Sequence, residues 1–204
     1  MEINSYSTWL EIDLNAITEN VAYIKRLTGV EVMAVIKANG YGHGARPAAQ
    51  AAVQGGATWC GVARIEEALA LRRAGISAEL MVLGYTPPSK IPEAIDQQIV
   101  VSLFDPSQAE TCLNYARING GRLRAHVKVE TGMGRLGMLP EEVIPFLRAL
   151  QGSAIQVEGI FTHFARADEP ESGYTQRQIE IFDQLLTELE QEGLKPPMVH
   201  AANS

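Results

Sequence analysis

Short continuous apolar runs recur along the chain, separated by longer and more polar segments. Runs of this length predict strands buried on both faces, as in parallel sheets. The strands predicted in this way span residues 32–36, 59–63, 80–84, 99–103, 123–129, 155–161 and 198–200. A stretch at 9–14 alternates apolar and polar residues instead, which predicts a further, half-buried strand near the N-terminus.

The intervening segments carry apolar residues at helical spacing, together with residues that begin or end helices. Asp13 or Asn15 is expected to cap the first helix, and Pro47 lies early in an alanine-rich one. Asp105 followed by Pro106 predicts an N-cap and a first helical position. Further helices are predicted at 65–74, 140–150 and 174–192.

Seven predicted strands thus alternate with helices, which implies parallel strands joined by crossover helices. A doubly wound open sheet has the same alternation. Polar, charged and glycine residues follow strand after strand, and this favours a TIM-like (β/α) barrel whose loops converge on one mouth. Because such a barrel has eight strands, we expect an α/β barrel truncated after its seventh strand, with residues 1–204 forming one incomplete domain.

Composition narrows the class of ligand. The chain is 46% hydrophobic, enough for a sizeable core, and carries a net charge of −7 without a basic run. Nucleic acid and membranes are therefore not expected as partners, and a small molecule is. The two isolated cysteines and the lack of an export signal or membrane-length apolar run predict a cytoplasmic protein.

Candidate chemistry follows four of the predicted strands. Lys37 ends the run at 32–36 and opens a glycine-rich loop that includes Tyr41; a lysine there is a candidate nucleophile toward aldehydes, and the loop suits an anion. Lys128 ends a second strand. Arg135 follows a glycine-rich loop, where its guanidinium can face a carboxylate or phenolate.

Two further strand ends complete the set. His163 follows the strand at 155–161, although a lone histidine at a strand end is more often structural. Asn203 and Ser204 end the sequence with an amide and a hydroxyl suited to phosphate oxygens, or to capping a helix. The histidines show no spacing typical of metal ligands, so no metal is expected.

Four segments, AVIKANGYGHG, KVETGMGRLG, THFARADE and HAANS, resemble in order and spacing the N-terminal barrel of the alanine racemases, which use pyridoxal 5'-phosphate. The resemblance spans essentially the whole chain. Two residues depart from it: Gly40 stands where the family often has alanine, and Glu130 where aspartate is common. Neither position reacts in the family's mechanism.

The resemblance implies a role for each site residue. Lys37 would form the Schiff base with the cofactor and act as one of two catalytic bases. Tyr41 and Ser204, next to Asn203, would bind the cofactor phosphate. Arg135 would bind the phenolic oxygen and the substrate carboxylate. His163 would pack beside the cofactor ring. Lys128 would be carbamylated, which would turn the lysine cation into an anion that holds Arg135.

The implied activity is interconversion of L-alanine and D-alanine, which supplies D-alanine for peptidoglycan in the cell wall. In the family the second base is a tyrosine from the C-terminal β domain of the partner subunit, so a homodimer is implied for the full-length enzyme. Neither that domain nor the eighth strand lies within these residues, and we expect the 204 residues alone to be inactive. The alternatives are a non-catalytic pyridoxal-phosphate-binding barrel and a pyridoxal-phosphate-dependent amino-acid decarboxylase of the same barrel type.

Overall fold

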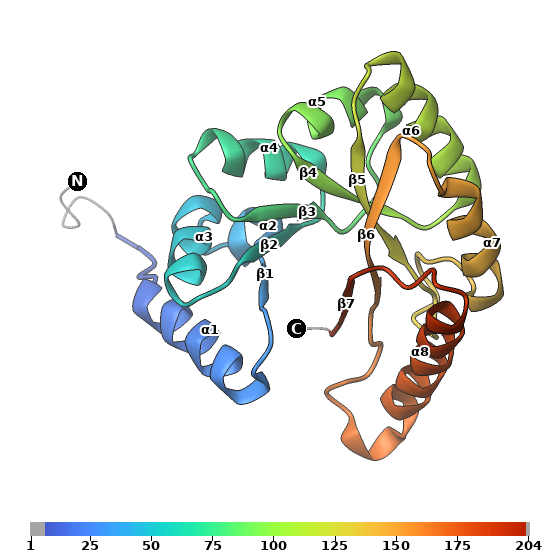
Figure 1. Cartoon of the computed structure of the whole chain (residues 1–204). Coiled ribbons are helices and arrows are strands. Elements are labelled where there is room, and N and C mark those ends of the chain that lie inside the picture. The colour runs from blue at the N-terminus through green and yellow to red at the C-terminus, as the bar shows by residue number, and fades with distance from the viewer. Residues whose placement is uncertain (1–6, 203–204) are drawn as a thin grey trace. The chain divides into compact units, whose positions relative to one another are not determined.

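The computed structural model describes residues 7–202 (Figure 1). The chain forms two compact units, one ending at Leu80 and the other beginning at Met81. Strand β3, Glu79–Val82, contains this boundary.

The first unit is built on two parallel strands and four helical segments. Strand β1 pairs with β2 so that Met33 lies opposite Trp59 and Val35 opposite Gly61. Four buried alanines, at positions 48, 49, 51 and 52, let helix α3 pack closely within the unit. The elements are α1 (Leu14–Thr28), β1 (Met33–Val35), α2 (Lys37–Tyr41), α3 (Ala45–Gln54), β2 (Trp59–Val62) and α4 (Ile65–Arg73).

Helix α1 has defined ends. The Asp13 carboxylate accepts the amide N–H groups of Asn15 and Ala16, at 2.9 and 3.2 Å, which satisfies donors that the first helical turn leaves unpaired. Gly29 ends the helix in the left-handed conformation, with its N–H donated to the Lys25 carbonyl. The predicted N-cap is therefore confirmed.

The prediction of a strand at 9–14 is wrong. Residues 9–13 form no regular element, and Leu14 already belongs to α1. Trp9 is 56% exposed and Leu10 is 86% exposed, so neither side of the alternating pattern is buried. An alternating apolar and polar pattern forms a strand only where a neighbouring strand supplies hydrogen bonds and a surface to cover. Here Asp13 instead caps the helix that begins at Leu14.

The second unit contains four successive parallel strands, and its helices lie along one face of them (Figure 1). Val101 lies opposite Ala125, His126 opposite Gly159, and Gly159 opposite Met198. The elements are η2 (Pro88–Lys90), α5 (Ile91–Asp96), β4 (Ile99–Leu103), α6 (Pro106–Ile118), β5 (Leu123–Lys128), α7 (Pro140–Leu150), β6 (Ile155–Thr162), η3 (Pro170–Ser172), α8 (Tyr174–Gln191) and β7 (Met198–Ala201).

Hydrogen bonds place β3 beside its sequence neighbours. The Glu79 amide donates to the Thr58 carbonyl next to β2, at 3.0 Å, and the Ser102 hydroxyl of β4 donates to the Val82 carbonyl, at 2.7 Å. Within residues 7–202, seven parallel strands alternate with helices, and strands that are neighbours in the sequence are neighbours in the sheet. The predicted α/β class with the element pattern of a TIM-like (β/α) barrel is confirmed. Every helix within residues 7–202 is too short or too polar to cross a bilayer.

Close packing between α1 and α3 generates a first prediction. A Cβ added at Gly55 would lie 2.4 Å from the Thr18 carbonyl oxygen and 2.8 Å from the Val21 Cβ. Gly55→Ala should therefore force the two helices apart and lower the free energy of unfolding by about 1–3 kcal/mol. Urea denaturation followed by fluorescence of the buried Trp59 would measure the change.

Gln54→Ala changes the neighbouring exposed position and is the matched control, expected to stay within about 0.5 kcal/mol of the parent chain. Equal stability of the two variants would show that the α1–α3 contact is not tight.

Candidate active site

Lys37 lies just past the end of β1 in the first unit, where its side chain is half-buried. The preceding residue, Ile36, donates its N–H to the Gly61 carbonyl of β2 at 2.7 Å, so the sheet ladder fixes the chain up to the lysine. The Lys37 Nζ lies 5.6 Å from the centroid of the Tyr41 ring. The structure thus brings together the two site residues predicted in this unit.

The four residues after Lys37 form a left-handed turn. Ala38, Asn39 and Gly40 have φ values of 51°, 55° and 63°, and Tyr41 has a φ of 54°. The left-handed conformation costs each residue other than glycine about 1–2 kcal/mol, so the turn persists only where surrounding contacts enforce it. The sequence predicts a glycine-rich loop here, and the structure shows that this loop begins with a defined turn.

Contacts on both sides hold this turn. The Asn39 side-chain oxygen accepts the Ala45 amide at 2.9 Å, and the Asn39 carbonyl accepts the Gly44 amide at 2.9 Å. Gly40 is buried, and a Cβ there would lie 3.1 Å from the Ala48 Cβ. The Glu67 carboxylate accepts the Ala38 amide at 2.7 Å. The turn is therefore fixed against both α3 and α4.

Helix α3 begins at Ala45, shortly after the turn. Its N-cap, Gly44, has a φ of 89°, which favours glycine. A helix N-terminus carries a partial positive charge, and the exposed Tyr41 hydroxyl lies on the preceding turn. These features fit an anionic group such as a phosphate.

In the second unit, Lys128 ends β5 and is 4% exposed. Its Nζ lies 5.6 Å from the centroid of the Phe161 ring on β6, a cation–π distance. Its backbone carbonyl accepts the Met138 amide at 2.9 Å. The carbamylation of Lys128 stays a prediction.

The Glu130 carboxylate organises the loop that carries Arg135. It accepts the amides of Gly132, Gly134 and Arg135 at 2.5, 2.8 and 3.2 Å. Burial raises the pKa of Glu130, but the hydrogen bonds from backbone amides outweigh this effect and leave the pKa below its ordinary value. The charged carboxylate thus holds Arg135 by its backbone, whereas the sequence suggested no part for Glu130.

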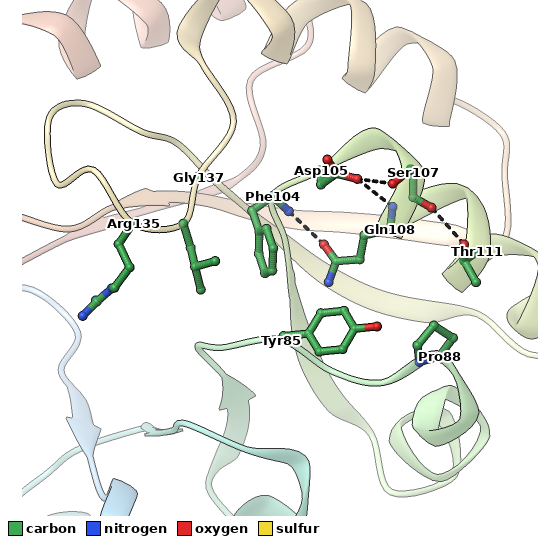
Figure 2. A pocket seen from close by; sticks show the side chains of 10 residues that line it. Tyr85, Pro88, Phe104, Asp105, Ser107, Gln108, Thr111, Arg135 and Gly137 are labelled. Carbon is green, nitrogen blue, oxygen red and sulfur yellow. Dashed lines mark hydrogen bonds between the residues drawn. The ribbon is translucent and has the colours of Figure 1, made fainter.

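Arg135 lies at the edge of a cavity of about 520 Å³ in the second unit (Figure 2). Its side chain points away from Phe104 and Gln108 (Figure 2). The far side of the cavity is fixed by a cap, since the Asp105 carboxylate accepts the Gln108 amide at 2.9 Å and the Gln108 side-chain oxygen accepts the Phe104 amide at 3.2 Å. The exposed guanidinium remains accessible to an anionic ligand.

His163 follows β6 and is half-buried. Its carbonyl accepts an N–H from the Gln178 side chain at 3.1 Å, and Gln178 also donates to the Thr131 hydroxyl at 3.1 Å. The Thr131 and Thr162 hydroxyls are hydrogen-bonded at 2.7 Å. This buried network ties the loops after β5 and β6 together. The sequence analysis did not identify Gln178, because a glutamine on an amphipathic helix is usually exposed.

A second arrangement that the sequence analysis did not identify joins the buried His126 to the half-buried His200. The His126 Nδ1 on β5 and the His200 Nε2 on β7 are 2.8 Å apart, and the His200 ring stacks on Phe161 with centroids 4.7 Å apart. A Cβ at Gly159 would lie 2.7 Å from the His126 ring, so glycine makes room for it. Burial, with smaller effects of His200 and Arg124, lowers the pKa of His126 to about 3, and burial lowers that of His200 to about 4.

The remaining predicted site residues, Asn203 and Ser204, lie outside the described residues. Within the described part of the chain, no group of three or more histidine, cysteine, aspartate or glutamate side chains could hold a metal ion.

Comparison with known proteins identifies the family. The profile of the alanine racemase N-terminal domain matches residues 12–204. The chain belongs to this family. Alanine racemase from Symbiobacterium thermophilum is 46% identical over 97% of the chain and 53% of the relative. Alanine racemase 1 from Bacillus subtilis is 41% identical over 97% of the chain and 50% of the relative. The chain thus spans about half the length of these curated relatives.

Solved structures of alanine racemases are similar to the chain as well. The crystal structure of alanine racemase from Bacillus anthracis with bound L-Ala-P is 40% identical, with a TM-score of 0.89 over 97% of this chain and 52% of that one. A histidine racemase from Leuconostoc mesenteroides is 29% identical, with a TM-score of 0.87 over 94% of this chain and 52% of that one. The resemblance carried by the four sequence motifs is confirmed.

The histidine pair generates a prediction about pH. Because both pKa values are lowered on folding, the unfolded chain binds more protons than the native chain below about pH 6.5. The free energy of unfolding should therefore fall on acidification from pH 7 to 5, by at most about 1.4 kcal/mol per pH unit for each histidine. Urea denaturation followed by circular dichroism at several pH values would measure the slope.

His200→Gln removes one of the two titrating groups and should make this slope shallower. An unchanged slope would mean that His200 takes up its proton equally well in the folded and unfolded chain.

Proposed function

We propose that this chain is the pyridoxal-phosphate-binding part of an alanine racemase, an isomerase that interconverts L-alanine and D-alanine. The proposal rests on one observation above all. Lys37 lies at the end of a strand, directly before a left-handed turn that contacts on two sides enforce, in a chain of the alanine racemase family. Backbone strain of this kind is concentrated at functional sites.

The residues of the first unit fit the cofactor. Lys37 supplies an amine that reacts with an aldehyde, and Tyr41, with the N-terminus of α3, supplies a hydroxyl and partial positive charge for a phosphate. When bound, the cofactor would draw electrons from the α-carbon of a joined amino acid and so acidify its α-hydrogen. Lys37 would hold the cofactor aldehyde and, once released, move a proton at the α-carbon on one face.

The residues of the second unit would bind charged groups of the cofactor and the substrate and orient them. Arg135 would donate hydrogen bonds to the cofactor's phenolic oxygen and to the substrate carboxylate, which suits a guanidinium held by its backbone on a rigid loop. His163 would pack beside the ring, and Asn203 and Ser204 would bind the phosphate. A carbamate on Lys128 would supply an anion that orients the Arg135 guanidinium.

Racemisation also requires a second base on the opposite face of the α-carbon. We propose that it comes from a C-terminal β domain of the partner subunit in a homodimeric full-length enzyme, as the family resemblance implies. Residues 1–204 would then be the cofactor-binding domain of a cytoplasmic enzyme that supplies D-alanine to the cell wall.

A racemase for another amino acid is the second candidate. A histidine racemase has a similar structure, at a TM-score of 0.87, so this fold is compatible with more than one amino-acid side chain. Turnover of L-alanine, L-serine and L-histidine by a full-length enzyme that contains these residues, followed by chiral chromatography, would separate the candidates. Turnover of L-histidine without turnover of L-alanine would rule out the first.

The cofactor assignment predicts a covalent bond at Lys37. The chain mixed with pyridoxal phosphate and reduced with borohydride should carry the reduced cofactor on the peptide that contains Lys37, and Lys37→Ala should lose this label completely. Absorption spectra before and after reduction, with peptide mass spectrometry, would measure both.

Lys195→Ala removes a lysine that pairs with Glu190 on the α8 side of the second unit, and this control should keep the label. A folded chain that carries no label on Lys37 would contradict the cofactor assignment. Turnover of L-alanine by these 204 residues alone would contradict the expectation that they are inactive.

A further inference from the structure

The Glu67 carboxylate joins two segments that are far apart in the sequence. Its Oε1 accepts the Ala38 amide at 2.7 Å, and its Oε2 accepts the amides of Ala63 and Arg64 at 2.8 and 3.0 Å. Ala38 belongs to the turn after Lys37, whereas Ala63 and Arg64 connect β2 to α4. One half-buried side chain therefore links the lysine turn to the neighbouring strand end.

The bond to Ala38 acts on the backbone next to Lys37. The Ala38 N–H belongs to the peptide group that follows Lys37, so holding it restricts the ψ of Lys37 and the φ of Ala38 together. Ala38 has φ and ψ of 51° each, a conformation that alanine rarely adopts without outside contacts. A charged acceptor makes this hydrogen bond stronger than one between neutral groups.

The opposite end of the link is rigid. Strand β2 pairs with β1 directly before the lysine, since the Ile36 amide donates to the Gly61 carbonyl at 2.7 Å. Glu67 therefore holds Ala38, the residue after Lys37, to the end of β2, and β2 also binds Ile36, the residue before Lys37. Lys37 lies between two fixed points.

We propose that Glu67 is a positioning residue for Lys37: it fixes the Lys37–Ala38 peptide so that the lysine amine is presented for covalent attachment to the cofactor. This inference rests on the proposed function for the identity of the aldehyde, but the backbone restraint it describes can be measured without any cofactor.

Capping of α4 alone would be the ordinary role of a carboxylate at this helix position. Helix α7 offers the comparison, because Glu142 occupies the same position and accepts the Leu139 amide at 3.0 Å, within its own helix end. Glu67 makes the equivalent bond to Arg64 and adds bonds to Ala63 and to Ala38. A test must therefore separate the added bonds from the cap.

The test compares Glu67→Gln with Glu142→Gln. Glutamine has one acceptor oxygen and an N–H₂ group, so at position 67 it cannot accept from both segments. The first measurement is amide hydrogen exchange at Ala38 in the chain without cofactor. The second is the rate at which pyridoxal phosphate attaches to Lys37, trapped with borohydride and quantified by peptide mass spectrometry. Circular dichroism compares the folding of both variants.

Glu67→Gln should accelerate exchange at Ala38 and slow attachment at Lys37, each by about tenfold, the effect of losing one hydrogen bond to a charged group. Glu142→Gln should change neither, because one glutamine oxygen still accepts the Leu139 amide within the same helix end. If the two variants behave alike, Glu67 only caps α4 and the proposal is overturned.

Failure of the cofactor assignment would look different. In that case the parent chain itself would carry no label on Lys37, whatever residue stands at position 67. Faster exchange at Ala38 in Glu67→Gln alone would still support the restraint on the lysine turn, and unchanged exchange would overturn it.

Discussion

The left-handed turn after Lys37 is the constraint on which the candidate site depends. Ala38, Asn39 and Tyr41 adopt positive φ angles that are unfavourable for residues with a Cβ. Hydrogen bonds from groups outside the turn compensate for this cost, since the Asn39 side chain accepts the Ala45 amide and Glu67 accepts the Ala38 amide. The direction of the lysine is thus determined by its neighbours rather than by its own conformational preference.

Carboxylates that accept backbone amides recur as the means of fixing loops in this chain. Glu67 holds the turn after β1, and Glu130 holds the loop that carries Arg135. A charged acceptor binds several N–H groups at once and so specifies a loop conformation at the cost of one partly buried charge. In each case the presented residue, Lys37 or Arg135, keeps its side chain available because the carboxylate binds only backbone.

Buried polar side chains fix the other strand ends of the second unit. Gln178 on α8 contacts the Thr131 hydroxyl and the His163 carbonyl, and the two threonines at 131 and 162 bond to each other. The histidine pair at 126 and 200 extends across β6, where Gly159 leaves space for a ring. The hydrogen bonds of Gln178 rigidify the loops that they join. The solved structures similar to this chain include an alanine racemase and a histidine racemase, so this fold by itself does not determine the amino acid.

The sequence by itself determined the alternation of strands and helices, the family, and the residues that carry candidate chemistry. Continuous apolar runs and helix caps act over a few neighbouring residues, so strands such as Ile99–Leu103 and the cap at Asp105 could be predicted from local pattern alone. The predicted strand at 9–14 was wrong because a strand also needs a partner, which local alternation cannot reveal. Tertiary structure alone decided the left-handed conformation of Ala38 and the parts played by Glu67, Gln178 and the histidine pair. Each of these depends on contacts between residues far apart in the chain, and no local pattern encodes such contacts.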